Sequence, residues 1–158
     1  MRIAVFAGSF DPFTKGHEEI VLRALPLFDK VIIAFGINSA KKYFYDLPLR
    51  MQMVEKLFEA QKDKIEVASY NGLTMHFAQE KGAQFLLRGL RNTTDYDYEY
   101  GIACGNKIAG KGLETIFLMA SPQYAHISST IVRELLKASE DVSAFLPKAI
   151  IELGQNSL

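Results

Sequence analysis

The sequence predicts an α/β fold, a Rossmann-like, doubly wound, five-stranded parallel sheet with helices on both faces. Five short apolar segments alternate with longer amphipathic segments, and this order is typical of parallel sheets because each crossover between parallel strands needs a helix. The apolar segments are nearly continuous, which indicates strands covered on both faces. A length of 158 residues without a Ser/Pro-rich linker or a repeat predicts a single domain, residues 1–158.

The strands are expected where runs of Ile, Val, Leu and Phe are too short for free-standing helices. In chain order these runs are residues 3–7, 31–36, 65–69, 85–87 and 115–119. In sheets of this kind the ligand binds beyond the carboxyl ends of the strands, where the strand order reverses. Functional residues are therefore expected just after each strand.

The helices are expected in the amphipathic segments between the strands. In chain order these segments are residues 16–28, 47–61, 73–81, 95–109, 128–138 and 147–153. The first has Ile20 and Phe28 on one face and Thr14 as a candidate N-cap. The second follows Asp46, a favourable N-cap, and the third ends before Gly82, a residue typical of helix C-termini.

The segment 95–109 carries two conflicting patterns. Residues 95–100 alternate Asp-Tyr-Asp-Tyr-Glu-Tyr with a period of two, which is typical of an exposed strand, whereas the residues beyond fit a helix. Gly101 and Gly105 would weaken that helix by about 1 kcal/mol each. We predict a helix, because two parallel strands must be joined by a crossover.

The composition excludes several classes of protein. Lys plus Arg and Asp plus Glu both number 18, so the formal net charge is zero, which argues against a nucleic-acid partner but allows a local cationic cluster. One cysteine, Cys104, excludes an internal disulfide and is expected to be a small packing residue. No apolar run reaches the ~18 residues of a membrane helix, and no signal-peptide pattern is recognised, so we expect a cytoplasmic protein without a membrane partner.

The first loop after a strand reads Gly-Ser-Phe-Asp-Pro-Phe-Thr-Lys-Gly-His over residues 8–17. With Thr14 as the N-cap, His17 falls in the first helical turn, where free N–H groups and a partial positive charge attract phosphate. The alternative is a surface or capping histidine. Neither a Walker A loop nor a Gly-x-Gly-x-x-Gly motif is present, so a P-loop enzyme and a dinucleotide redox enzyme are not favoured.

Two further loops carry cations. Lys41 and Lys42 follow the second strand, and they form either a solvated face or a contact to phosphate. Arg88 and Arg91 follow the fourth strand, and a guanidinium there binds phosphate through two parallel hydrogen bonds. The alternative is ion pairing with the acidic residues among 95–99. Both interpretations can hold together, because an acidic partner would orient the guanidinium.

The last loop, residues 121–127, leads into three hydroxyl residues, Ser128, Ser129 and Thr130. Hydroxyl groups at the start of a helix suit phosphate binding, whereas simple N-capping needs only one of them. His126 precedes this cluster and is a weaker candidate for the site. His76 lies on a helix with an apolar face and is expected to be structural.

The loops together resemble one superfamily. Residues 8–17 are similar to the Thr/Ser-x-Asp-Pro-x-x-x-Gly-His signature of nucleotidyltransferases, and residues 127–133 are similar to their second signature, Ile-Ser-Ser-Thr-x-x-Arg. Within the superfamily, Lys41-Lys42, Gly72-Leu73 and residues 88–91 and 95–99 resemble the bacterial phosphopantetheine adenylyltransferases, and the resemblance covers nearly the whole chain. Residues 46–50 depart from the commoner pattern of that family and are expected on a helix surface.

The resemblance implies a reaction and its partners. These enzymes transfer the adenylyl group of ATP reversibly to 4′-phosphopantetheine, giving dephospho-CoA and pyrophosphate, by in-line attack and with Mg²⁺. It also implies a homohexamer and feedback inhibition by CoA. The alternatives are a sister enzyme that acts on nicotinamide mononucleotide, a cytidylyltransferase, or a non-catalytic nucleotide-binding module, because a fold does not fix a function.

The resemblance further implies roles for individual residues. His17 is the expected catalytic residue, which stabilises the transition state at the α-phosphate. The residues expected to bind ATP are Ser9, Phe10, His17, Gly89, Leu90, Arg91, Glu99, Tyr124, Ala125, His126, Ile127, Ser128, Ser129 and Thr130. The residues expected to bind phosphopantetheine are Ser9, Lys41, Thr74 and Arg88. No side chain is expected as a metal ligand.

Overall fold

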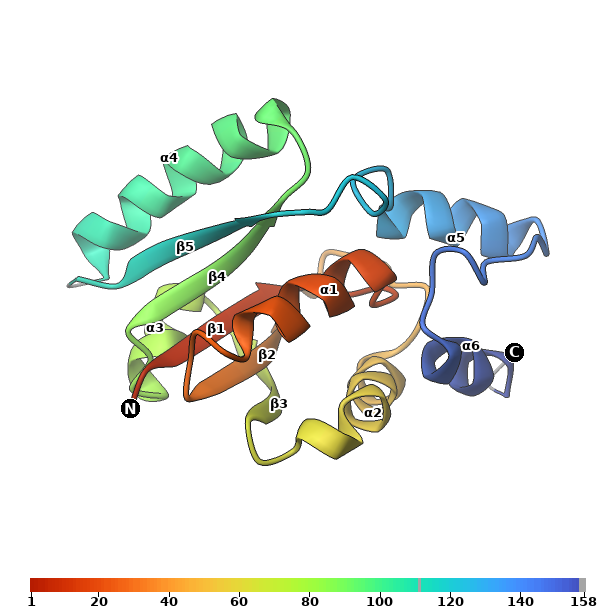
Figure 1. Cartoon of the computed structure of the whole chain (residues 1–158), viewed down its shortest axis with the longest axis horizontal. Helices are drawn as coiled ribbons and strands as arrows, with labels where there is room; N and C mark the ends of the chain where they lie inside the picture. The colour runs from red at the N-terminus through yellow and green to blue at the C-terminus, as the bar shows by residue number, and fades with distance from the viewer. Residues whose placement is uncertain (111, 157–158) are drawn as a thin grey trace.

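The computed structural model describes residues 1–110 and 112–156, and it contains one sheet of five parallel strands (Figure 1). In chain order the strands are β1 (Ile3–Gly8), β2 (Lys30–Ile37), β3 (Ile65–Asn71), β4 (Phe85–Leu90) and β5 (Glu114–Met119). Their order across the sheet is β3-β2-β1-β4-β5. The chain thus winds outward from β1 to β3, returns to the other side of β1, and winds outward again, which confirms the predicted fold class.

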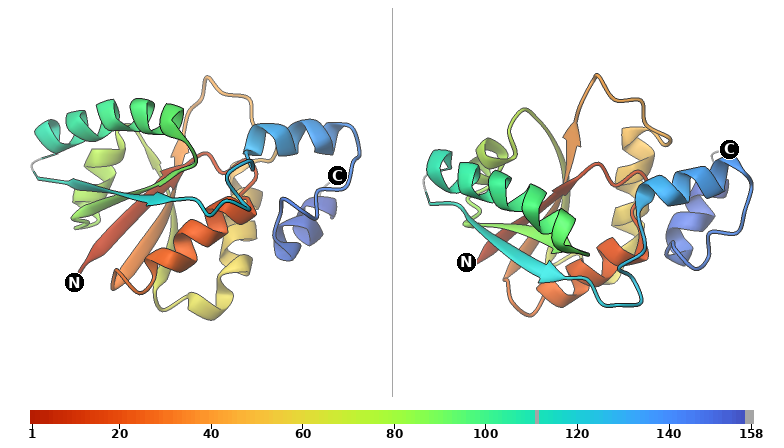
Figure 2. Two further views of the ribbon diagram at one scale, coloured as in Figure 1. Left: turned by 45° about the horizontal axis from the view of Figure 1, so that its top comes forward. Right: turned by 90° about the horizontal axis from the view of Figure 1, so that it is seen from above.

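Helices cover both faces of the sheet (Figure 2). They are α1 (Lys15–Ala24), α2 (Leu47–Leu57), α3 (Thr74–Glu80), α4 (Thr93–Ala109), α5 (Ser129–Lys137) and α6 (Lys148–Gln155), with a short 3₁₀ turn at Glu59–Gln61. In Figure 2, α3 and α4 lie on one face and α1 and α2 on the other, while α5 and α6 lie together at one end of the molecule. None of the helices in the described part of the chain is long and apolar enough to span a membrane.

Each face of the sheet has its own core, because successive strand residues point to opposite sides. Phe6 of β1 and Ile33 of β2 pack with the buried residues of α1 and α2. Val5 and Ile32, their neighbours in sequence, pack on the other face with Phe77 of α3. These strands are buried on both faces, as their continuous apolar sequences predict.

The predicted helix ends are confirmed where a specific side chain fixes them. The Thr14 hydroxyl accepts the His17 N–H at the start of α1, and the Asp46 carboxylate accepts the Leu49 N–H, 2.9 Å away, at the start of α2. Gly82 follows α3 with a φ of +65°, a left-handed conformation that glycine adopts without strain.

Two predicted helices end earlier than expected. The first ends at Ala24 rather than at residue 28, because Pro26 has no N–H and cannot continue the helical hydrogen bonds. The second divides at Phe58, whose φ of −106° and ψ of 21° separate α2 from the 3₁₀ turn. The segment 95–109, with its conflicting patterns, is helical as predicted and lies in α4, which Asn92 caps by accepting the Asp95 N–H.

The predicted end of the fourth strand at residue 87 is wrong. β4 continues to Leu90, and Arg88 and Leu90 pair with Phe117 and Met119 of β5. Arg88 is therefore a strand residue rather than a loop residue. Its backbone is held by the sheet ladder, which fixes the origin of its side chain more firmly than a loop would.

Candidate active site

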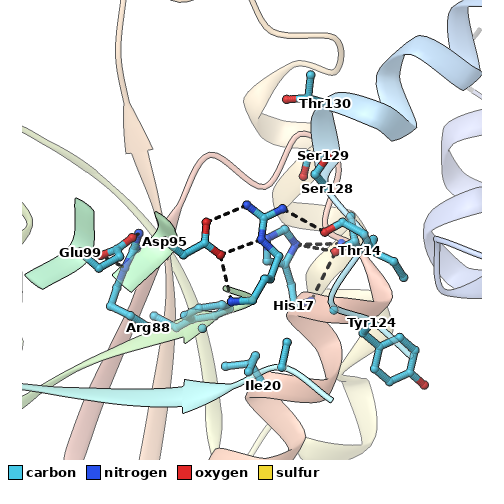
Figure 3. Close-up of a pocket in the computed structure, with 16 residues that line it drawn as sticks. Thr14, His17, Ile20, Arg88, Asp95, Glu99, Tyr124, Ser128, Ser129 and Thr130 are labelled. Atoms are coloured by element: carbon cyan, nitrogen blue, oxygen red, sulfur yellow. Dashed lines mark hydrogen bonds and ion pairs between the residues drawn. The ribbon is translucent and has the colours of Figure 1, made fainter. Parts of the chain in front are cut away.

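Two cavities lie at the carboxyl ends of the strands, and both are lined by Arg88. The α1 cavity, about 330 Å³, lies between the start of α1, the end of β4 and the start of α5 (Figure 3). The β2 cavity, about 450 Å³, lies between the ends of β1 and β2 and the start of α3. Arg88 is thus the point where the two cavities meet.

His17 lines the α1 cavity and is held by the turn that starts α1. Its Nδ1 accepts the backbone N–H of Thr14 at 3.0 Å, and the Thr14 hydroxyl lies at the same distance. Because Nδ1 is an acceptor, the proton of the neutral imidazole is on Nε2. Burial, together with the positive charges of Arg91 and Arg88, lowers the pKa of His17 to about 3. His17 therefore offers one N–H donor without a charge.

The two arginines each bind a carboxylate, and both line the α1 cavity. Arg88 donates from Nε to Glu99 at 2.8 Å, from Nη2 to the other Glu99 oxygen, and from Nη1 to the Ala7 carbonyl at 2.6 Å. Arg91 donates to Asp95 from Nε at 2.9 Å and from Nη2 at 3.1 Å. The hydrogen bonds from Arg91 lower the pKa of Asp95, so this carboxylate is ionised at neutral pH. The predicted ion pairs are present, and they orient both guanidinium groups.

Glu99 was expected to contact ATP, but its carboxylate is engaged by Arg88. It is buried, and both of its carboxylate oxygens accept hydrogen bonds from Arg88. Its immediate effect is therefore to hold Arg88 in place at the junction of the cavities.

The three hydroxyl residues at the start of α5 line the α1 cavity, and each has a different partner. Ser128 caps α5. Ser129 donates to the Pro12 carbonyl at 2.8 Å, and the Thr130 hydroxyl accepts from Arg133 at 3.1 Å. Capping thus accounts for one hydroxyl, as the alternative interpretation required, while Ser129 joins α5 to the loop that precedes α1.

The β2 cavity contains all four residues expected to bind phosphopantetheine. Ser9, Lys41, Thr74 and Arg88 line it together, although they come from four separate segments. The Thr74 hydroxyl lies 2.7 Å from the hydroxyl of Tyr70. Lys42, the neighbour of Lys41, is not among the lining residues, although both lysines are exposed.

The α1 cavity contains most of the residues expected to bind ATP. These are His17, Gly89, Arg91, Glu99, Tyr124, Ile127, Ser128, Ser129 and Thr130. The remaining five, which do not line it, are Ser9, Phe10, Leu90, Ala125 and His126. Phe10 and Leu90 are buried, whereas the His126 ring is exposed and lies 6.1 Å from the ring of Phe145.

The sequence analysis missed one buried charge near the site. Arg50, in the segment expected on a helix surface, is only 3% exposed, so that expectation is wrong for this residue. Its guanidinium donates to the carbonyl of Ser9, a residue that lines the β2 cavity. A signal was present in the spacing, because Arg50, Met53 and Val54 share one face of α2 at i, i+3 and i+4, the face that packs on the core.

The site has the donors for a polyphosphate but no built metal cage. Among residues 1–110 and 112–156, no group of three or more His, Cys, Asp and Glu side chains could hold a metal ion. Asp95 and Glu99, the carboxylates nearest the cavities, are engaged by arginines. One neutral imidazole, two oriented guanidinium groups and the N-terminal ends of α1 and α5 can stabilise negative charge that develops between the cavities.

Comparisons with known proteins agree with this chemistry. The cytidylyltransferase-like family model matches residues 5–135. A phosphopantetheine adenylyltransferase of Cytophaga hutchinsonii is 54% identical over 149 residues, covering 94% of this chain and 99% of that protein. Proteins of the same name from Phocaeicola vulgatus and Leptospira biflexa are 48% and 45% identical, each covering 95% of this chain, and 98% and 93% of the respective relative.

Motifs, fold and overall similarity thus give one answer. The two signatures flank the α1 cavity, and the relatives match along almost their entire length. The chain belongs to the phosphopantetheine adenylyltransferase family of cytidylyltransferase-like proteins.

Proposed function

We propose that this protein transfers the adenylyl group of ATP to 4′-phosphopantetheine, giving dephospho-CoA and pyrophosphate. The observation that carries the proposal is that two cavities meet at one arginine, Arg88, with the His17 donor beside it. A donor triphosphate in the α1 cavity and an acceptor phosphate in the β2 cavity would then meet at Arg88. The names of the relatives agree with this reaction.

The reaction needs charge stabilisation more than proton transfer. A phosphate oxygen of the acceptor attacks the α-phosphorus of ATP, a new P–O bond forms, and the bond from the α-phosphorus to the bridging oxygen breaks as pyrophosphate leaves. The acceptor is a phosphate monoester with a second pKa near ~6, so it is largely a dianion at neutral pH and needs no general base. The barrier comes from the repulsion between the two phosphate anions, and the positive charges of Lys41, Arg88 and Arg91 reduce that repulsion.

His17 acts in this proposal as a neutral hydrogen-bond donor to an α-phosphate oxygen. Its Nδ1 is occupied by the Thr14 N–H, so Nε2–H is the group available to the substrate. Its low pKa means that it starts the reaction uncharged and remains a donor at any physiological pH. An oriented donor of this kind is typically worth a factor of ~10²–10³ in turnover.

We propose Mg²⁺ as the divalent ion that accompanies ATP. Membership in a family of ATP-using nucleotidyltransferases implies a divalent metal. Magnesium keeps several waters and is bound largely through substrate phosphates, which suits a site whose nearby carboxylates are already paired with arginines. When bound, the ion supplies positive charge to the pyrophosphate leaving group.

Several further properties follow from family membership and remain proposals. We propose a single domain in the cytoplasm that assembles as a homohexamer, and the exposed Tyr98, Tyr100 and Ile108 on α4 support an interface between copies.

We also propose inhibition by CoA, because a molecule that joins an adenylyl group to a pantetheine arm would occupy both cavities at once. Light scattering tests the hexamer, and steady-state kinetics with added CoA test the inhibition.

The direct test of the reaction is to incubate the protein with ATP, Mg²⁺ and 4′-phosphopantetheine and to detect dephospho-CoA by mass. Parallel incubations replace the acceptor with nicotinamide mononucleotide, or ATP with CTP, and pyrophosphate release is measured in all of them. We expect release only with ATP and 4′-phosphopantetheine. Nucleotide binding without release from any pair would make the protein a non-catalytic module and would end the proposal.

The role of His17 is tested with His17→Gln. Glutamine can keep the capping interaction with the Thr14 N–H, so the start of α1 is preserved while the imidazole donor is lost. We expect turnover to fall by ~10²–10³ with ATP affinity nearly unchanged, measured by steady-state kinetics and calorimetry. Near-normal turnover would remove His17 from the reaction.

A further inference from the structure

Two loops border the β2 cavity, and each carries residues that line it. The first loop, residues 9–14, joins β1 to α1 and contributes Ser9. The second loop, residues 38–46, joins β2 to α2 and contributes Lys41 and Tyr43. The width of the cavity therefore depends on the spacing between these loops.

Asp11 joins the first loop to the second. Its side chain is only 4% exposed, and its two oxygens accept the backbone N–H groups of Phe44, at 2.6 Å, and Tyr45, at 2.9 Å. A buried carboxylate is expensive unless it is hydrogen-bonded, and here main-chain donors of the second loop supply both hydrogen bonds. The carboxylate of the first loop thus fixes the backbone of the second.

Arg50 also joins these two loops, but as a donor to backbone carbonyls where Asp11 is an acceptor from backbone N–H groups. From the first turns of α2, its Nη1 donates to the Ser9 carbonyl, and its Nε donates to the Tyr45 carbonyl at 3.0 Å. The guanidinium also lies over the Tyr43 ring, 4.1 Å from the ring centroid. Burial lowers the pKa of Arg50, and the nearby Asp11 opposes that shift. Arg50 stays charged, as arginines in proteins do.

Each of these two charged side chains contacts residues that line the β2 cavity, or their neighbours in sequence, although it lines neither the α1 cavity nor the β2 cavity itself. Asp11 and Arg50 are absent from the linings of both cavities, whereas Ser9 and Tyr43, which touch the Arg50 guanidinium, line the β2 cavity. We propose that Asp11 and Arg50 are positioning residues, which fix the spacing of the first and second loops and thereby set the binding of the acceptor phosphate. The inference rests on the proposed function.

The chemistry of the two side chains explains why these residue types are used. A planar guanidinium can donate in two directions and stack on a ring at the same time, whereas a lysine ammonium is a point charge without a flat face. A carboxylate offers two acceptor oxygens for two adjacent N–H groups, whereas an asparagine offers one. Arg50→Lys and Asp11→Asn therefore each remove part of the contacts that join the first loop to the second. Both substitutions nearly preserve size, and Arg50→Lys also preserves charge.

The test measures steady-state kinetics of Arg50→Lys and Asp11→Asn against Val54→Ala. Val54 is fully buried on the same helix and lies in the core, so its truncation lowers stability without altering either junction. We expect the first two variants to raise the KM for 4′-phosphopantetheine about tenfold and to leave the KM for ATP within about twofold. Val54→Ala should leave the KM values for 4′-phosphopantetheine and ATP near those of wild type. Thermal unfolding should show that it loses about as much stability as Arg50→Lys and Asp11→Asn do.

The double variant Asp11→Asn/Arg50→Lys tests whether the two residues act together on the spacing of the loops or affect the acceptor KM independently. Because both residues hold the same pair of loops, we expect its acceptor KM to rise by clearly less than the product of the single effects. Wild-type protein without dephospho-CoA synthesis would overturn the proposed function. Active wild type with an acceptor KM no more altered in Arg50→Lys and Asp11→Asn than in Val54→Ala would overturn this inference alone. If Arg50→Lys does not fold, Asp11→Asn decides.

Discussion

At the scale of single residues, His17 occupies the third position of α1, where helices with a threonine N-cap commonly carry Glu or Gln. Histidine makes the same reciprocal contacts with Thr14 and adds a ring whose second nitrogen remains free for a ligand. The capping interpretation and the phosphate interpretation of this histidine are therefore compatible. The cap fixes the tautomer on which the proposed mechanism relies.

The low pKa of His17 makes stability depend on pH in a definite direction. The folded-state pKa of about 3 lies below the ordinary value of 6.5, so the folded protein binds fewer protons than the unfolded chain at acid pH. The stabilisation is complete above about pH 6.5 and is lost as the pH falls toward 3. We expect wild type to lose more stability between pH 7 and pH 5 than His17→Gln, as measured by urea unfolding.

The comparison between the two proteins controls for the acidic groups. Hydrogen bonds lower the pKa values of Glu66 and Asp95, but these groups are present in both proteins and their contributions cancel in the difference. Equal losses of stability in the two proteins between pH 7 and pH 5 would contradict the burial of a neutral His17.

Residue types in a motif could be predicted from the sequence, whereas their partners could not. Thr14, His17 and Lys41 could be predicted because they lie in the polar segments that follow β1 and β2. Arg50 was missed because nothing local announces that a charged side chain is buried. Its carbonyl partners lie 41 positions away at Ser9 and nearby at Tyr45, and only the folded chain brings them together.

At the scale of elements, α4 is a long helix with two interior glycines that the structure does not require. A Cβ atom added at Gly105 or Gly101 would meet nothing within 4 Å. Glycine costs roughly 0.5–1 kcal/mol relative to alanine in the middle of a helix. We expect Gly105→Ala to raise the free energy of unfolding by about that amount without changing turnover, as measured by urea unfolding and steady-state kinetics.

Gly154, in α6, is the matched control for that substitution. A Cβ atom there would lie 2.7 Å from the hydroxyl and 3.2 Å from Cζ of Tyr45, a side chain that is itself buried. Gly154→Ala should therefore lower stability, although alanine is the better helix former at this position too. A loss of stability in Gly105→Ala would show that its side of α4 is packed against something in solution.

Element boundaries were predictable where one residue decides them and unpredictable where pairing decides. Asp46 and Gly82 fix helix ends by their own chemistry. The end of β4 depends on its neighbour, because Arg88 and Gly89 are not apolar and join the strand only through pairing with β5. Apolar run length therefore underestimates a strand whose last residues serve the site.

At the scale of the whole molecule, a chain with zero net charge concentrates cations where strand ends meet. Arg88 is at the centre of this arrangement, since it lines both cavities and is held by Glu99 from α4. We expect Arg88→Ala to raise the KM for the acceptor at least tenfold and to lower turnover by about 10². The substitution removes the positive charge that faces both proposed substrates. Steady-state kinetics with each substrate varied in turn measure both effects.

The substitution also leaves the Glu99 carboxylate buried without its partner, which destabilises the protein separately. The double variant Arg88→Ala/Glu99→Gln removes that orphaned charge. It should recover stability in thermal unfolding while turnover stays low. Recovery of turnover as well would mean that Arg88 serves only to satisfy Glu99.

The fold class of the whole chain was predictable because the alternation of strands and helices favours a parallel sheet with helices on both faces. The strand order β3-β2-β1-β4-β5 does not follow from that alternation, which other doubly wound sheets share. The division of the site into two cavities was not predictable from that alternation. It depends on which side of β1 each loop emerges, and on side chains such as Arg88 that separate one space from the other.

The engaged Nδ1 of His17 has a consequence for pyrophosphorolysis, the opposite direction of the chemistry. An imidazole that donates from one nitrogen and accepts from the main chain with the other neither gains nor loses a proton as the phosphoryl centre inverts. In the proposed mechanism His17 therefore offers the same donor in both directions, and no resetting step is needed between synthesis and breakdown of the product.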